Sequence, residues 1–467
     1  MKTNKLFASA LLTGMMLSAT TVANAASPTT VKHPDWAPSA VIYEVNTRQF
    51  SDDGTFNSVN ANLDRLKNLG VDILWFMPIH PISELNRKGG LGSYYSVADY
   101  KAVNPEFGTL DDFKALVANA HERGMKVILD WVPNHTGCDN PWVTEHPDYY
   151  ALNEQGEMFG PFDWTDVYKL DYSNPATREA MIDAMSFWLT DVGVDGFRCD
   201  VAMQVPTDFW NEARPRLQAL KPDLFMLAEA SEPDLEEHAF DMAYNWPMKD
   251  LFSAIAATSG QYKYQPAEGA PHKFPVTRAT DIATLHQQQQ ADYPYGAYMM
   301  NMITNHDLNS WEGTEFERLG DFVPAFAVLS YTLPGMPLIY TGQEVGLDRA
   351  FEFFVKDKAP DWTPNDWTKF YTALNGLKHA RPELSADASV GSMITYTTTS
   401  PDVLVFERRA GKSRTLVGVN LGTEETAVTF TGMSPDTKGA KAVMTETEMT
   451  EIPASLKPGE YFMFTIN

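Results

Sequence analysis

Short apolar runs alternate with longer segments of helical periodicity along most of the chain, from Val41 onward. Eight of the short runs are predicted strands, at residues 41–46, 72–78, 126–132, 194–201, 224–229, 241–246, 298–307 and 337–344. Between them, apolar residues three and four positions apart predict helices at 60–69, 110–123, 177–192, 207–220 and 321–333. This alternation predicts an α/β fold, the (β/α)8 or TIM barrel, whose active sites lie at the carboxyl ends of the strands.

Two parts of the chain depart from this alternation. Residues 136–172 follow the third strand, are rich in aromatic side chains and lack periodicity, which predicts a small subdomain inserted in the barrel at 26–383. After it, alternating runs separated by turn formers predict an antiparallel β-sandwich at 384–467, with strands at 393–397, 403–408, 414–420, 427–430, 440–444 and 460–466. The glutamine run at 287–290 is expected in a loop.

The first 25 residues have the features of a secretory signal peptide. Lys2 and Lys5 precede an apolar stretch at 6–22, and Ala23-Asn24-Ala25 fits a cleavage site. We therefore expect an exported protein, periplasmic or secreted. No later stretch is long and apolar enough to predict membrane insertion.

Charge and cysteine content narrow the function further. The net charge of −25 argues against nucleic acid as a partner, which would call for a basic face, and favours a neutral substrate. Cys138 and Cys199 are the two cysteines. An exported protein permits a bridge between them, but Cys199 in its apolar strand is typical of a small buried hydrophobe.

Two charged residues interrupt the fourth predicted strand. Residues 194–202 have the sequence Val-Asp-Gly-Phe-Arg-Cys-Asp-Val-Ala, so Arg198 and Asp200 share one strand face and Cys199 points to the other. A strand buried on both faces rarely carries charge. The pattern favours a functional site, the alternative being a buried ion pair in the core.

Other predicted strands also end in polar residues. The third is followed by Asn134 and His135, the fifth ends at Glu229, and the seventh ends at His306 and Asp307. In a barrel these ends converge on one rim. Because like charges in a cleft repel one another, three carboxylates there favour catalysis over a structural role.

Two carboxyl groups with separate roles fit glycoside hydrolysis. Arg198 is expected to lower the pKa of Asp200, as suits a nucleophile. Glu229 ends an apolar strand, and burial there is expected to raise its pKa, as suits a general acid. Neighbouring strands place the two groups near the separation of about 5 to 5.5 Å typical of a retaining mechanism. His135, His306 and Asp307 are expected to bind sugar hydroxyls.

Together these motifs resemble the α-amylase family of glycoside hydrolases, family 13, over about residues 41–382. The resemblance implies an enzyme that cleaves α-1,4-glucosidic bonds of starch or maltooligosaccharides with retention. It implies that Asp200 is the nucleophile, Glu229 the acid/base and Asp307 the transition-state stabiliser. The implied substrate-binding residues are Tyr95, which lies in Gly92-Ser93-Tyr94-Tyr95-Ser96 and stacks on a sugar, with His135, Arg198 and His306.

The sequence departs from the family pattern in two places. Met203 and Gln204 stand where many members have a Lys-His pair, which contacts the sugar on the leaving side and a calcium ion. Lys169 stands where calcium-binding members have an aspartate, and its ammonium would occupy the place of the cation, although Asn134 matches a calcium ligand. We therefore expect no metal and no other cofactor. Both departures resemble the neopullulanase and cyclomaltodextrinase branch.

Three alternatives to simple α-amylase action stay open. A sugar acceptor in place of water would make the protein an α-glucan transglycosylase, and the branch resemblance allows neopullulanase or cyclomaltodextrinase activity. The third is a non-catalytic carbohydrate-binding protein on the same barrel, since fold does not imply activity. The complete acidic trio argues against the third.

Overall fold

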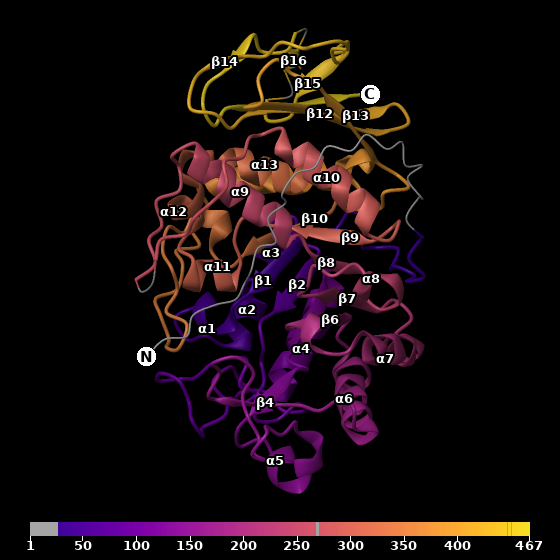
Figure 1. Ribbon diagram of the computed structural model, residues 1–467, viewed down its shortest axis with the longest axis vertical. Helices are drawn as coiled ribbons and strands as arrows, with labels where there is room; N and C mark the ends of the chain where they lie inside the picture. Colours follow the sequence, from indigo (N-terminus) through magenta and orange to yellow (C-terminus); the bar gives the residue numbers. More distant parts are fainter. Residues whose placement is uncertain (1–26, 268–269, 446, 450) are drawn as a thin grey trace.

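The chain folds around a closed barrel of eight parallel strands in the order β1-β10-β9-β8-β7-β6-β3-β2 (Figure 1). The computed structural model describes residues 27–267, 270–445, 447–449 and 451–467, so the predicted signal peptide lies outside the described residues. The barrel strands are β1 (Ile42–Val45), β2 (Ile73–Phe76), β3 (Lys126–Trp131), β6 (Gly196–Cys199), β7 (Phe225–Ala228), β8 (Met242–Tyr244), β9 (Tyr298–Asn301) and β10 (Met336–Tyr340). The predicted (β/α)8 barrel is confirmed.

Helices surround this barrel and bury their apolar faces against it. The longer ones are α4 (Leu110–Glu122), α6 (Pro175–Phe187), which continues as the π-helical turn η2 (Trp188–Val192), α7 (Thr207–Leu220), α9 (Trp246–Thr258), α10 (Asp281–Asp292), α13 (Val323–Thr332) and α14 (Asp366–Ala380). The shorter ones are α1 (Thr47–Phe50), α2 (Phe56–Ala61), α3 (Leu63–Leu69), α8 (Leu235–His238), α11 (His306–Trp311) and α12 (Glu315–Leu319). Among the described residues no helix is long and apolar enough to cross a bilayer.

Local sequence explains where several helices begin. Thr109 and Asp112 form a reciprocal capping box at the start of α4, and Asn365 caps α14 in the same way. The glutamine run at 287–290, expected in a loop, lies instead within α10. That expectation was wrong because glutamine is a good helix former.

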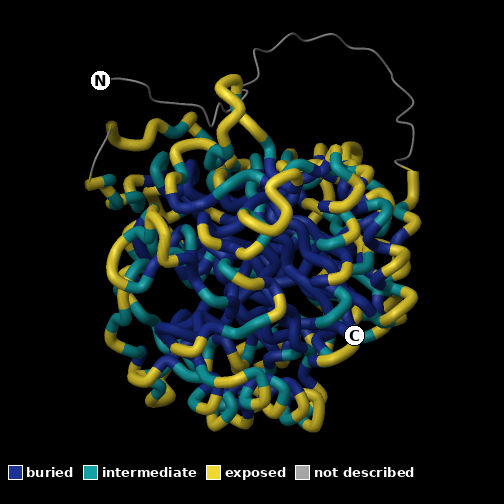
Figure 2. The backbone as a smooth tube through the Cα atoms, turned by 90° about the horizontal axis from the view of Figure 1, so that it is seen from below, coloured by how far each residue is buried: buried dark blue, intermediate teal, exposed yellow. Residues whose placement is uncertain are grey.

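Alternation along the strands separates the barrel interior from the layer under the helices. On β7, Phe225 and Leu227 pack inside the barrel, whereas Met226 and Ala228 pack outward. Buried residues fill both layers (Figure 2). Gly196 on β6 pairs with Phe225, and a Cβ there would lie 1.8 Å from the Phe225 carbonyl oxygen. Only glycine therefore lets β6 approach β7 this closely.

All eight barrel strands end before the predicted last residue, and the difference changes the site at the third and seventh. The third ends at Trp131, and His135 lies on β4 (His135–Gly137), which pairs with β5 (Val167–Lys169) in a separate antiparallel hairpin. The seventh ends at Asn301, and the chain resumes as α11 at His306. The Asn305 side chain accepts a hydrogen bond from the Leu308 N–H at 2.8 Å, and this cap starts a helix where the apolar pattern indicated strand.

The segment between β3 and α6 stands apart from the barrel, at the end of the molecule away from the C-terminal sheet (Figure 1). It holds the β4-β5 hairpin, α5 (Trp142–Glu145) and the 3-10 turn η1 (Pro147–Tyr149). Trp142 packs on Tyr100 and Tyr149 in its core. Cys138 and Cys199 are both buried and free, so they form no bridge.

The C-terminal residues form a six-stranded antiparallel sheet in the order β11-β12-β13-β18-β15-β16, stacked over α10 and α13 (Figure 1). Its strands are β11 (Ser392–Tyr396), β12 (Val403–Ala410), β13 (Ser413–Asn420), β15 (Ala440–Ala442), β16 (Glu448–Met449) and β18 (Tyr461–Ile466). The pair β14 (Thr426–Ala427) and β17 (Ser455–Leu456) forms a small second sheet. Buried Arg408 ties this domain to the barrel side, donating to the carbonyls of Thr332 and Ser385.

Candidate active site

Arg198 is the centre of a cluster of charges at the carboxyl ends of the barrel strands. Its Nη1 lies 2.9 Å from Asp130 Oδ1 and 3.2 Å from Asp200 Oδ1, and its Nη2 lies 3.0 Å from Glu229 Oε2. Arg198 and Asp130 are fully buried, whereas Asp200 and Glu229 keep 7% and 8% of their surface exposed. The two carboxyl groups predicted to share the chemistry therefore meet on one guanidinium and both reach solvent.

A strained turn fixes Glu229 relative to Asp200. Val201, which follows Asp200 directly, has φ +37° and ψ +48°, a left-handed conformation that is a genuine outlier for a β-branched residue. Such a residue costs about 1 to 3 kcal/mol and persists where the surrounding structure requires it. In this turn the Val201 N–H donates to Glu229 Oε2 at 2.7 Å. The strained turn thus provides the hydrogen bond that orients the carboxyl group of Glu229.

His306 contacts both the buried Glu44 and Tyr95, the residue predicted to stack on a sugar. Its Nδ1 lies 2.5 Å from Glu44 Oε1, and its Nε2 lies 2.7 Å from the hydroxyl of Tyr95. The two rings stack with centroids 5.5 Å apart. Asp307, on the first turn of α11, places Oδ2 3.4 Å from the same Nε2, and its side chain is 36% exposed. The structure therefore brings three predicted residues, Tyr95, His306 and Asp307, into one group.

His135 reaches the site from the hairpin rather than from a barrel strand. Its Nε2 lies 3.2 Å from the Tyr95 carbonyl oxygen, and its ring meets Trp164 edge-on at 5.2 Å. Burial lowers the pKa of His135 to about 3, and the nearby Lys169 ammonium acts in the same direction. His135 is therefore neutral and can donate a hydrogen bond from Nε2. Trp164, unlike Trp142, borders the site.

The structure changes the predicted electrostatics of Asp200. Burial raises the pKa of Asp200 well above its usual value, the Glu229 carboxylate raises it further, and Arg198 offsets these effects only in part. Arg198 lowers the pKa of Asp200 as predicted, but the predicted net decrease was wrong, because burial and the neighbouring carboxylates outweigh the guanidinium. Asp200 therefore favours its protonated form above the usual carboxyl range.

Sequence reasoning gave no role to Asp130, Glu44 or Tyr244, which are buried and contact the predicted site residues. Asp130 Oδ2 accepts hydrogen bonds from Trp75 Nε1 and from the Tyr95 hydroxyl, each at 3.2 Å. The Tyr244 hydroxyl accepts a hydrogen bond from Arg198 Nε at 3.1 Å. An available signal was the single acid inside each of two otherwise apolar strands, β1 and β3.

We predict that His306 makes stability depend on pH. Burial lowers its pKa, but the Asp307 and Glu44 carboxylates outweigh burial and raise it to about 9. The ion pairs stabilise the fold fully below the ordinary histidine pKa near 6.5, and this contribution is lost as pH rises through about 9. Its pH-dependent part is on the order of 3 kcal/mol.

Denaturant unfolding of the wild type and His306→Gln from pH 6 to pH 10 measures this contribution. The difference in unfolding free energy should shrink as the pH rises. A difference that stays constant across this range would contradict the assigned charge on His306.

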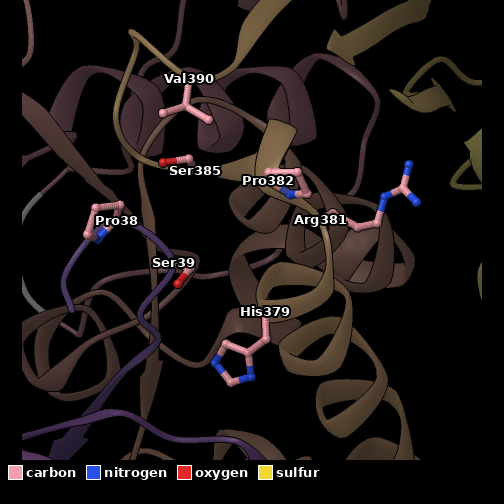
Figure 3. A pocket seen from close by; sticks show the side chains of 7 residues that line it. All are labelled: Pro38, Ser39, His379, Arg381, Pro382, Ser385 and Val390. Carbon is pink, nitrogen blue, oxygen red and sulfur yellow. The ribbon is translucent and has the colours of Figure 1, made fainter. Parts of the chain in front are cut away.

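A hollow of about 270 Å³ lies at the other end of the barrel (Figure 3). Its lining residues are Pro38, Ser39, His379, Arg381, Pro382, Ser385 and Val390. His379 pairs with Asp72 at 2.6 Å, and Arg381 binds Glu383 and two backbone carbonyls. Because these polar groups already have partners and no carboxyl pair faces the hollow, it has no equivalent of the Arg198 cluster.

Fold and site together define a class of protein. A closed (β/α)8 barrel that carries two carboxyl groups on one arginine at its catalytic rim is a glycoside hydrolase of the two-carboxylate type. The alpha-amylase catalytic domain family matches residues 38–168 and 151–381. The chain belongs to this family.

Known proteins resemble the chain over most of its length. It is 28% identical to alpha-amylase MalA of Haloarcula japonica over 88% of this chain and 59% of that protein. It is 30% identical to the trehalose synthase/amylase TreS of Mycobacterium tuberculosis over 75% of this chain and 70% of that protein. The crystal structure of an alpha-amylase from Lactobacillus plantarum is 31% identical, with a TM-score of 0.78 over 92% of this chain and 99% of that one.

Proposed function

We propose that the protein hydrolyses α-1,4-glucosidic bonds of starch or maltooligosaccharides with retention of configuration. The observation that carries the proposal is the pair of partly exposed carboxyl groups, Asp200 and Glu229, on the Arg198 guanidinium. The Val201 N–H, adjacent to Asp200, also binds Glu229, which keeps the two groups close. A short separation is typical of retaining enzymes, since inverting ones need room for a water between the carboxyl groups.

In the first step, the carboxylate of Asp200 attacks the anomeric carbon while the bond to the leaving sugar breaks. Glu229, as the general acid, gives its proton to the leaving oxygen. The step leaves a glycosyl ester on Asp200 and a carboxylate on Glu229. Burial and Glu229 raise the pKa of Asp200, so Asp200 must lose its own proton before it attacks.

In the second step, Glu229 takes a proton from a water molecule as its oxygen bonds to the anomeric carbon from the face that the leaving sugar vacated, and the ester bond to Asp200 on the opposite face breaks. Asp200 is released as a carboxylate and Glu229 is again protonated. The positive charge that develops on the sugar ring is stabilised by Asp307 and by the ring face of Tyr95. His306, held by Glu44, positions the Tyr95 hydroxyl and Asp307 toward the sugar, and neutral His135 holds the Tyr95 backbone through its carbonyl.

Product analysis tests this proposal. Purified protein incubated with maltotriose or starch should release sugars whose first-formed anomer is α, as followed by proton NMR before mutarotation. A β-anomer formed first would contradict retention. Absence of hydrolysis on both substrates would contradict the proposed function.

Transfer to a sugar acceptor is the second candidate, because one relative is named a trehalose synthase/amylase. Met203 and Gln204 lie in the turn η3 (Ala202–Gln204), just after the proposed nucleophile Asp200. They replace the Lys-His pair that contacts the sugar on the leaving side in many family members, so the acceptor side of this site differs. High maltotriose concentrations would then give chains longer than the substrate. Glucose and maltose alone would favour hydrolysis.

We also propose that activity does not depend on calcium. Lys169 lies on β5 beside His135, where an ammonium disfavours a cation, and Asn134 contacts the His135 ring. Within the described part of the chain, no three His, Cys, Asp or Glu side chains are grouped to hold a metal ion. Incubation with a chelator should therefore leave both the thermal midpoint and hydrolysis unchanged. A loss that added calcium reverses would refute this proposal.

A further inference from the structure

Trp311 is a large aromatic side chain left half exposed on the catalytic rim. Its exposed fraction is 50%, although the residue ends the short helix α11 that carries Asp307. Residues four apart on a helix share one face, so Trp311 lies one turn beyond Asp307 on the same side. With the rings that adjoin it, Trp311 forms a contiguous apolar patch of the kind that marks ligand-binding surfaces.

The surface around Trp311 is built from packed aromatic rings. Its ring lies 5.2 Å from Phe353 and 5.9 Å from Phe354, and Phe353 meets buried Tyr94 edge-on at 5.2 Å. Gly89 approaches Phe354 so closely that a Cβ there would lie 2.4 Å from it. We call Trp311, Phe353 and Phe354 the aromatic wall. It packs against the barrel rim and contacts Tyr94, the residue before Tyr95.

The barrel order places the aromatic wall across from Glu229. Glu229 follows β7, and β1 stands four strands from β7 in either direction around the barrel. The segment with Phe353 and Phe354 follows β10 and binds the loop after β2, since the Leu91 N–H donates to the Phe354 carbonyl at 2.8 Å. Because β1 lies between β10 and β2 in the barrel, the aromatic wall lies over the carboxyl end of β1. Because Glu229 protonates the leaving oxygen, the leaving sugar lies on its side and the wall faces the sugars on the non-reducing side.

We propose that Trp311, supported by Phe353 and Phe354, is a stacking platform for a glucose ring on the non-reducing side of the sugar held at Tyr95. The inference rests on the proposed function and adds a preference for longer α-glucans. A glucose ring presents an apolar face of C–H groups, which an indole face covers well. A chain long enough to reach the wall gains this contact, and a single glucoside does not.

The test compares substrates of different length. In Trp311→Leu, which keeps an apolar side chain without an aromatic face, the ratio of kcat/KM for maltoheptaose to that for 4-nitrophenyl α-glucoside should fall about tenfold. Trp311→Phe, which keeps a ring, should retain most of the ratio. Leu220→Ala, at a comparably exposed apolar residue that ends α7, is the matched control and should leave the ratio unchanged.

Binding separates this inference from the proposed function. In an Asp200→Asn background, calorimetry should show that Trp311→Leu weakens maltoheptaose about tenfold more than it weakens methyl α-glucoside, which has a single ring. A wild type that hydrolyses no α-glucan would refute the function, while this binding difference would still support the platform. Three results would overturn the platform. One is an equal loss of affinity for both sugars, and another is an unchanged kcat/KM ratio in folded Trp311→Leu. The third is a change in oligomeric state alone, as measured by light scattering.

Discussion

Asparagine in place of Asp200 is expected to lower kcat on maltotriose by about 10⁴-fold or more, because the amide cannot form the glycosyl ester. The fold should survive this change. Burial and Glu229 raise the pKa of Asp200, which means that its ionised form is costly in the folded protein. The thermal midpoint of Asp200→Asn should therefore equal or exceed that of the wild type.

Glu229→Gln tests the other half of the pair through the leaving group. General acid catalysis contributes about 10²- to 10⁴-fold, so maltotriose hydrolysis should fall by that factor. An activated aryl glucoside needs little protonation and should lose far less in its first step. Glu237→Gln, at an exposed glutamate, is the matched control. Wild-type rates in Asp200→Asn or Glu229→Gln would refute the assigned roles.

Replacing Arg198 with methionine is expected to destabilise the fold by about 3 to 5 kcal/mol, the usual cost of removing one partner from a buried ion pair. Arg198 is fully buried, and its loss leaves Asp130, Asp200 and Glu229 facing one another without a counterion. Denaturant unfolding at neutral pH measures this loss. The deficit should narrow in acid, where the carboxyl groups are protonated.

Arg216→Met gives the matched control for this prediction. Arg216 also binds two glutamates, Glu179 and Glu212, but its side chain is 42% exposed. Exposed pairs of this kind contribute about 0 to 1 kcal/mol. If both arginine variants lose the same small amount, the Arg198 cluster does not stabilise the barrel in the way inferred from its burial.

Several features of the site could be predicted because they depend on local pattern. A period of two along β6 predicts that Arg198 points away from Cys199, and the structure places Arg198 among the carboxyl groups and Cys199 in the outer layer. The same reasoning located Glu229 at the end of β7. The predicted strand at 298–307 was too long, since the Asn305 cap starts α11 at His306 where the apolar pattern indicated strand.

Other features depend on residues far apart in the chain. Glu44 contacts His306 across 262 positions, and Tyr95 contacts the same ring across 211. The net pKa of Asp200 depends on burial and on the sum of charges from three strands, so inspection of its neighbour Arg198 gave the wrong sign. Likewise, the exposed aromatic wall exists only because the segment after β10 packs against the loop after β2.

The sequence by itself determined the barrel, the C-terminal antiparallel domain and the resemblance to one enzyme family, because periodicity and short motifs are local properties. The tertiary structure alone decided the direction in which the pKa of Asp200 shifts, which acids support the site, and where Trp311 lies. These properties arise from burial and from Coulomb interactions, which depend on distance in space rather than along the chain.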